Sequence, residues 1–106
     1  MDMLLYQEKA TRTLNNSLSK QECITNLCMG IAGESGELID YFKKHIFHGH
    51  DLDREHVKSE LGDILWYLAC LADTLEISLD DVSLSNVEKL EARYPEGFSQ
   101  EKSKNR

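Results

Sequence analysis

Apolar residues recur at intervals of three and four along most of the chain, which is the spacing of one helical face. The pattern predicts one short helix at about residues 3–14, followed by turn-forming residues at 15–17. Three longer helices are predicted at about 20–45, 54–75 and 79–93. Together these elements predict an all-α fold, an antiparallel helical bundle of about four helices that oligomerisation completes.

Residue signals at the helix ends support these boundaries. Ser19 and Glu22 have the spacing of a capping box, in which side chains bond the free backbone N–H groups of the first turn. Ser78 begins a second such box, and Asp53 is the expected cap of the helix between them. Residues 47–51 interrupt the periodic pattern and are predicted to form a loop.

The chain is expected to form a single domain. It has 106 residues, which suits one modest core, and it contains no internal repeat or low-complexity linker. The domain is predicted to cover residues 1–98, because Pro95 and Gly97 follow the last helix. Residues 99–106 are predicted to be a frayed polar tail.

Two pairs of acidic residues interrupt the apolar faces of the first two long helices. The members of each pair are three residues apart and share one helical face: Glu34, Glu37, Glu60 and Asp63. Glu34, for example, lies between Ile31 and Leu38 in the apolar stripe. Carboxylates on the inner edges of neighbouring helices cost several kcal/mol each in desolvation and repel one another. Protons, cationic side chains or metal ions must neutralise them, and multivalent cations fit best.

Solvated surface charge is the alternative interpretation of any one of these acids, but two such pairs favour a metal site. Oxygen-only ligands favour hard cations, and Mg²⁺ typically shares its coordination shell with substrate phosphates. A di-iron bundle would instead need a Glu-x-x-His pattern, and no histidine follows either pair at that spacing. The histidines within residues 45–56 have no nearby cysteine and give no closed set of zinc ligands.

Two glycines also lie in the interior of the helix that carries the first acidic pair. Gly33 and Gly36 flank Glu34, and each costs about 1 kcal/mol relative to alanine at such a position. They indicate that a helix, a ligand or a metal-bound phosphate packs close to the backbone there.

The last long helix carries a second candidate feature. A polar and cationic stripe runs beside its apolar stripe: Asn86, Lys89 and Arg93. An amphipathic helix with a solvated basic edge accounts for this pattern as well as a phosphate-binding surface does. Tyr67 lies one turn after Asp63, so its hydroxyl could reach the acidic site, whereas Trp66 is expected in the core.

Charge and cysteine usage narrow the class of protein. A formal net charge of −7 argues against general binding to nucleic acid or to an anionic membrane. It is compatible with a small phosphate-bearing substrate, because a bound metal reverses the local field. Cys28 and Cys70 are expected to be buried free thiols of a reducing compartment. No signal peptide or long apolar span is recognisable, so the cytoplasm is the expected location.

The four acids and their surroundings resemble the signature of the all-α nucleoside triphosphate pyrophosphohydrolases. That superfamily includes MazG-type enzymes, dimeric dUTPases, dCTP pyrophosphatases and phosphoribosyl-ATP pyrophosphohydrolases. The similar segments, which lie within residues 24–98, are IAGESGELIDYFKKHIFHG, ELGDILWYLACLA, ISLDDV and NVEKLEARYPEGF. They are most similar to small single-domain MazG-like proteins. One departure is Gly33, where many relatives carry a further acid, which leaves open which residue activates water.

The resemblance implies a hydrolase acting on acid anhydrides, which cleaves the α–β bond of an NTP or dNTP to the monophosphate and pyrophosphate. Nucleotide-pool housecleaning is the role that this activity would suit. It implies Mg²⁺, with Mn²⁺ as a substitute, held by Glu34, Glu37, Glu60 and Asp63. Glu34 or Glu37 would orient the attacking water. The implied phosphate contacts are Tyr67, Asn86, Lys89 and Arg93. A homodimer or homotetramer is expected. The alternatives are a phosphoribosyl-ATP pyrophosphohydrolase and a non-catalytic, cation-binding helical interaction module.

Overall fold

A computed structural model describes residues 1–105, and these residues form an all-α structure. Four helices correspond to the predicted ones and a short fifth helix follows them: α1 (Met3–Thr11), α2 (Lys20–His48), α3 (Arg54–Thr74), α4 (Leu79–Arg93) and α5 (Gln100–Lys104). The all-α prediction is therefore confirmed. The helix α5 lies in the residues expected to be a frayed tail, and Ser99 caps it by accepting a hydrogen bond from the Lys102 N–H.

Three of the longer helices begin at the predicted capping residues. The Ser19 hydroxyl accepts a hydrogen bond from the Glu22 N–H at 3.1 Å, and the Glu22 carboxylate accepts one from the Ser19 N–H at 3.0 Å. This completes the capping box at the start of α2. The side chains of Asp53 and Ser78 likewise accept backbone N–H groups in the first turns of α3 and α4.

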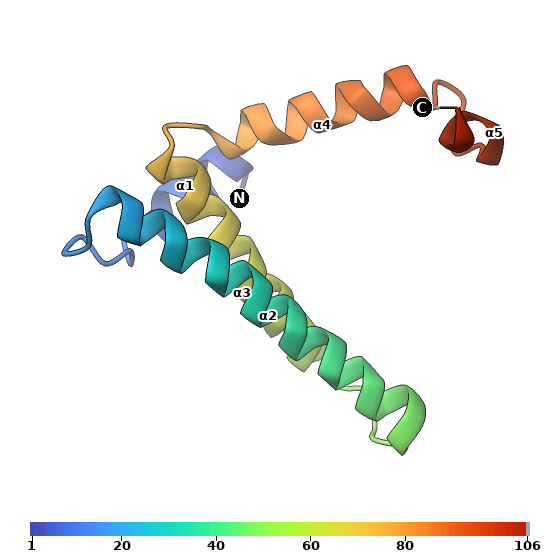
Figure 1. Cartoon of the computed structure of the whole chain (residues 1–106), viewed down its shortest axis with the longest axis horizontal. Coiled ribbons are helices and arrows are strands. Elements are labelled where there is room, and N and C mark those ends of the chain that lie inside the picture. Colours follow the sequence, from blue (N-terminus) through green and yellow to red (C-terminus); the bar gives the residue numbers. More distant parts are fainter. Residues whose placement is uncertain (106) are drawn as a thin grey trace.

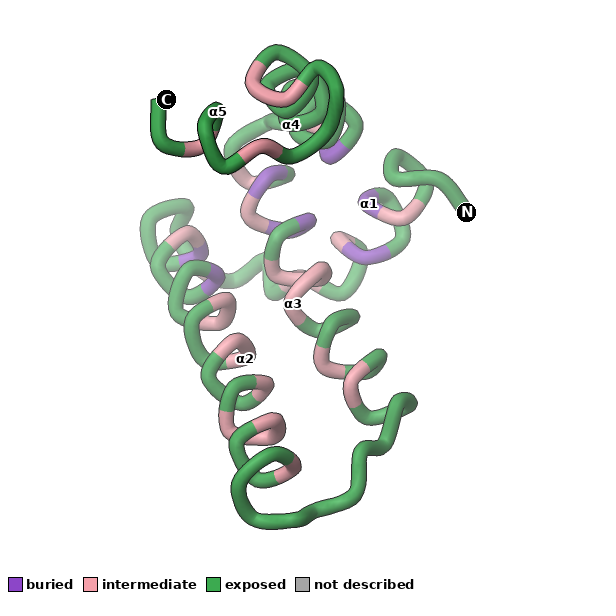
Figure 2. Tube along the Cα trace, turned by 90° about the vertical axis from the view of Figure 1, so that its right-hand side faces the viewer, coloured by how far each residue is buried: buried purple, intermediate pink, exposed green. Residues whose placement is uncertain are grey.

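The helices α2 and α3 lie side by side and form a hairpin (Figure 1). Gly49 ends α2 in a left-handed conformation with φ of 73°, and its N–H donates to the Lys44 carbonyl. The helix therefore includes residues 47–48, which were expected in the loop. The Tyr41 hydroxyl accepts a hydrogen bond from the Asp53 N–H at 2.6 Å, which fixes the start of α3 against α2. Figure 2 shows that the half-buried parts of the two helices face each other.

The buried core lies where α1 crosses one end of this hairpin. It consists of two clusters: Ala10, Ala69, Ala72 and Leu79, and next to them Cys23, Leu27 and Cys70. Trp66 packs against both clusters, as expected of a core residue, and its indole N–H donates to the Thr13 hydroxyl at 2.8 Å. Trp66 therefore links α1 to the middle of α3.

One buried polar side chain, Gln7, joins three helices. Its amide nitrogen donates to the Ala69 carbonyl at 3.2 Å and to the Ile77 carbonyl at 3.0 Å. Its amide oxygen accepts the Leu79 N–H at 2.9 Å. Gln7 thus satisfies backbone groups at the turn between α3 and α4 and sets the direction in which α4 leaves the core.

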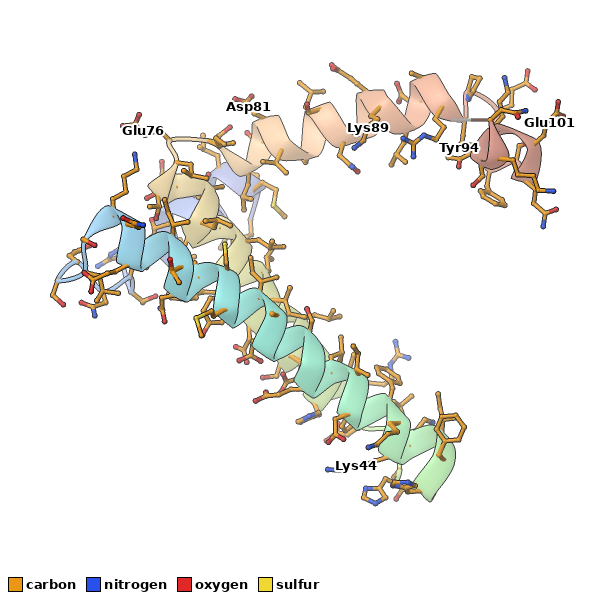
Figure 3. All side chains as sticks on the ribbon, in the orientation of Figure 1. Lys44, Glu76, Asp81, Lys89, Tyr94 and Glu101 are labelled. Carbon is orange, nitrogen blue, oxygen red and sulfur yellow. The ribbon has the colours of Figure 1, made fainter. Side chains whose placement is uncertain are left out.

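The helices α4 and α5 form an arm that projects away from the hairpin (Figures 1 and 3). Leu79, the first residue of α4, is buried, but residues 80–92 are all exposed. Exposed apolar side chains on α4 include Val82, Val87 and Leu90, with 44–48% of their surface accessible. The fourth helix therefore does not lie along the hairpin within one chain, and its apolar stripe is uncovered.

The cysteines depart from expectation at one position. Cys70 is buried as predicted, and Cys23 is buried beside it, but Cys28 is exposed. Cys28 lies one residue after the fully buried Leu27, and a step of one residue turns a helical side chain about 100° away from the core. Within residues 1–105, no helix has both the length and the apolar character that crossing a membrane requires.

Candidate metal and nucleotide site

The first acidic pair lies on α2 and the second on α3, at the level where the two helices of the hairpin pack together. Three of the four predicted ligands converge there: Glu34, Glu37 and Glu60 each offer a carboxylate oxygen, and these oxygens all lie within 4.8 Å of one another. We call these three residues the glutamate cluster. Glu34 and Glu60 are half-buried, whereas Glu37 is exposed at the edge.

The glutamate cluster contains two carboxylate oxygens that nothing satisfies. Oε2 of Glu34 and Oε2 of Glu60 are buried, and neither has a hydrogen-bond partner among residues 1–105. In this described part of the chain, no lysine or arginine forms an ion pair with the cluster; Lys43 and Lys44 instead pair with Asp40 at 3.5 and 2.9 Å. Buried acceptors without a donor are rare and costly, so the cluster needs a proton or a cation.

The raised pKa of Glu34 also indicates that the glutamate cluster requires a proton or a cation. The pKa of Glu34 is raised to about 7, mainly because a proton on Glu34 would let this carboxyl donate a hydrogen bond to Glu60, a bond that is missing while both are ionised. Burial raises this pKa further, as do the negative charges of Glu37, Glu60 and Asp63. A metal ion among these oxygens would remove both the repulsion and the need for the proton.

His56 was not identified from the sequence, although it lies one turn before Glu60 on α3. Its Nε2 is 3.8 Å from Oε1 of Glu60, and it pairs with that carboxylate when protonated. The His56 ring also packs on the Tyr41 ring, with 4.5 Å between centroids. The sequence did contain a signal for this pair, because His56 and Glu60 are four residues apart and such residues share one helical face.

Asp63 lies outside the glutamate cluster, although the sequence grouped it with the other three acids. It lines a cavity of about 220 Å³ with Glu34, Trp66 and Tyr67. Tyr67 thus lies beside two of the predicted metal ligands. This cavity is the opening through which a ligand can approach the acids from the Tyr67 side.

The predicted phosphate contacts on α4 are not brought to the acids within one chain. Lys89 lies on the arm, away from the hairpin (Figure 3). Lys89 and Arg93 border a hollow of about 500 Å³ between α4 and α5, together with Ala92, Glu101, Lys102 and Asn105. Asn86 is exposed on the same helix. The arrangement thus separates the acidic site on the hairpin from the predicted phosphate contacts on the arm.

The donor set fits a hard divalent cation. The three glutamates offer oxygen ligands only, and two of their oxygens are buried without a partner. Open coordination positions on such an ion would be available to water and to phosphate oxygens. The arrangement can therefore bring a polyphosphate and a water molecule together at the face of the hairpin.

Comparisons with known proteins agree with this chemistry. Residues 23–98 match the family described as the MazG nucleotide pyrophosphohydrolase domain. The matched residues include both acidic pairs and α4. The chain is also similar to the Gene 37 protein of Mycobacterium phage L5, with 34% identity over 89 residues, which cover 80% of this chain and 78% of that protein. No solved structure matches the chain significantly.

Proposed function

Because the chain belongs to the MazG nucleotide pyrophosphohydrolase family, we propose that it hydrolyses a nucleoside triphosphate, NTP or dNTP, at the α–β phosphoanhydride. Water would attack the α-phosphorus, the bond from that atom to the bridging oxygen would break, and the products would be the monophosphate and pyrophosphate. The observation that carries this proposal is the glutamate cluster, with carboxylate oxygens from two helices within 4.8 Å of one another.

Glu34, Glu37 and Glu60 would hold Mg²⁺, or Mn²⁺ as a substitute, with Asp63 as the fourth ligand. When bound, the ion would neutralise the triphosphate and lower the pKa of a coordinated water. The unpartnered oxygens of Glu34 and Glu60 support this assignment, because each has a free lone pair in a buried position. Asp63 would take part through small side-chain movements, since it already borders the cavity that Glu34 lines.

The remaining groups of the hairpin would orient water and substrate. Glu34 or Glu37 would hold the attacking water, and Glu34 is better placed, since it lies both in the glutamate cluster and in the wall of the cavity with Tyr67. The Tyr67 hydroxyl would donate to a phosphate oxygen. Its place beside Glu34 and Asp63 supports this role.

The arm would act in a second copy of the chain, so that the working enzyme is a homodimer or homotetramer. Asn86, Lys89 and Arg93 carry the polar and positive groups that a triphosphate needs, but they lie away from the acids of their own chain. Val87 and Leu90 on the same helix expose an apolar stripe that packing against another chain would cover. Only the side of α4 that carries Lys89 and Arg93 has charge complementary to the acids of a partner, because the helix also carries four acidic residues.

Subunit mixing tests this shared site. The Glu60→Gln chain lacks a metal ligand but keeps its cations, whereas the Lys89→Ala chain lacks a cation but keeps its acids. Each variant alone should be inactive or nearly so. When the two chains are co-expressed in equal amounts with different tags and pair at random as dimers, about a quarter of the wild-type activity should return, because half of all dimers contain both chains and one of the two sites in each of these is intact. No recovery in verified mixed oligomers would contradict a site built from two chains.

The substrate is tested by measuring pyrophosphate release from a panel of NTPs and dNTPs, with Mg²⁺ or with EDTA. The proposed function predicts release that needs the metal and is lost in the Glu37→Gln and Asp63→Asn variants. If pyrophosphate were released from phosphoribosyl-ATP and from no NTP or dNTP, phosphoribosyl-ATP would be the substrate instead. Metal binding without turnover of any triphosphate would identify a non-catalytic cation-binding module instead.

A further inference from the structure

Gly30 makes a close contact that sets it apart from the other glycines of α2. A Cβ atom at this position would overlap the ring of Tyr67, so the ring occupies the space that any side chain at residue 30 would need. Gly33 and Gly36 differ, because a Cβ atom at either would meet no atom within 4 Å. Within the chain, the close packing expected at Gly33 and Gly36 therefore occurs one turn earlier, at Gly30.

This contact lies directly beside the proposed reaction site. Gly30 is one turn before Glu34 on α2, and Tyr67 is one turn after Asp63 on α3. Glu34, Asp63 and Tyr67 line the same cavity. The position of the Tyr67 ring against the α2 backbone consequently decides where its hydroxyl lies relative to the carboxylates.

A second neighbour, Trp66, also packs against the Tyr67 ring. The Trp66 ring meets it edge to face, with 5.0 Å between centroids and 84° between planes. Trp66 is itself held by its hydrogen bond to the Thr13 hydroxyl at 2.8 Å. The tyrosine ring thus packs against an indole that a hydrogen bond holds in place and against a backbone position that has no side chain.

We propose that Gly30 is a positioning residue: the absence of its side chain lets the Tyr67 ring pack against α2 and thereby holds the Tyr67 hydroxyl where it contacts the substrate phosphates. This inference rests on the proposed function, since the substrate contact is part of it. Even a methyl group at residue 30 forces the rigid ring into another rotamer, which carries the hydroxyl away from its place. A displacement of about 1 Å in such a contact can lower a rate on the order of a hundredfold.

The test compares Gly30→Ala with Gly33→Ala. Both substitutions remove a glycine from the interior of the same helix, so their effect on helix propensity is alike, but only the first meets Tyr67. We expect Gly30→Ala to lower kcat/KM for the preferred triphosphate by about tenfold or more relative to Gly33→Ala. In a Tyr67→Ala background the space is empty, and adding Gly30→Ala should then change kcat/KM less than about twofold.

Spectroscopy supplies a readout that does not depend on turnover. Trp66 is the only tryptophan of the chain and contacts the Tyr67 ring, so its emission and the near-ultraviolet circular dichroism report on that ring. We expect both signals to change in Gly30→Ala and to remain as in wild type in Gly33→Ala. Thermal unfolding of both variants distinguishes a displaced Tyr67 ring from a general loss of stability, since only the latter lowers the melting temperature of Gly30→Ala well below that of Gly33→Ala.

Two results would overturn the inference: equal kinetics and equal Trp66 signals in Gly30→Ala and Gly33→Ala, or an undiminished effect of Gly30→Ala in the Tyr67→Ala background. A failure of the proposed function is distinguishable, because the wild-type protein itself would then release no pyrophosphate. In that case the Trp66 signals of the two alanine variants still decide whether Gly30 sets the place of the Tyr67 ring.

Discussion

Replacing Glu60 with glutamine isolates the electrostatic cost of the glutamate cluster. Only 13% of the Glu60 side chain is exposed, and its buried Oε2 has no hydrogen-bond partner, like Oε2 of Glu34. The amide group introduced by Glu60→Gln has the same shape, removes one negative charge, and can donate a hydrogen bond to the Glu34 carboxylate. We therefore expect this conservative change to stabilise the metal-free protein.

The magnitude follows from the hydrogen bond that the substitution creates. A typical bond of this kind contributes about 0.5–1.5 kcal/mol net, and more when one partner is charged. A gain of about 1 kcal/mol raises the melting temperature of a domain of this size by roughly 4–6 °C. Bound metal should make the wild-type protein the more stable of the two. At a free metal concentration of about one hundred times Kd, binding adds about 2.7 kcal/mol to the free energy of unfolding of the wild-type protein, and the Glu60→Gln protein lacks most of this gain.

Differential scanning calorimetry at pH 8 measures both effects. In EDTA the Glu60→Gln protein should melt above wild type, and in saturating Mg²⁺ or Mn²⁺ it should melt below. Glu8→Gln, at an exposed site on α1, is the matched control and should follow wild type in both conditions. A Glu60→Gln protein that melts below wild type in EDTA, or that keeps the full metal response, would refute the reasoning.

Two further predictions concern pH and the core. In EDTA the free energy of unfolding should fall as pH rises from about 4.5 to about 7, because the pKa of Glu34 is raised to about 7 in the folded protein and the folded state retains a proton that the unfolded chain has lost. Melting curves of Glu34→Gln, recorded in parallel, should lack this part of the decline, and identical pH profiles of the two proteins would contradict the assignment. Gln7→Leu should cost about 2–3 kcal/mol in urea unfolding, because the Leu79 N–H and two carbonyls lose their partner in the core. Gln21→Leu, at an exposed position, is its control, and a difference below about 0.5 kcal/mol between the two variants would show that Gln7 is dispensable.

The helix boundaries were largely predictable because capping is local. Ser19, Asp53 and Ser78 cap the helices that the sequence assigned to them. The end of α2 was placed too early, since the apolar period weakens before Gly49, whereas it is the left-handed turn at Gly49 that ends the helix. The buried face of a helix is harder to predict than its ends, because an error of one residue moves a side chain to another face. Cys28 was expected to be buried, but it is exposed, one residue from the buried Leu27.

The site was predictable only as far as single helices determine it. The spacing within each acidic pair follows from helical geometry, but the register between α2 and α3 does not, so the convergence of Glu34, Glu37 and Glu60 without Asp63 required the structure. The contact of Gly30 with Tyr67 depends on the same register. The direction of α4 could not be predicted from the sequence either, because an amphipathic stripe indicates that a helix face packs against something but does not identify the element that covers it.

The products formed in oxygen-18-labelled water show directly which bond of the triphosphate the protein cleaves. A preferred NTP or dNTP is incubated with Mg²⁺ and the protein, and the products are separated and weighed by mass spectrometry. We expect monophosphate and pyrophosphate in equal amounts, with the label in the monophosphate, and no product from Glu60→Gln. Diphosphate with inorganic phosphate, label in the pyrophosphate, or equal turnover by Glu60→Gln would contradict this expectation.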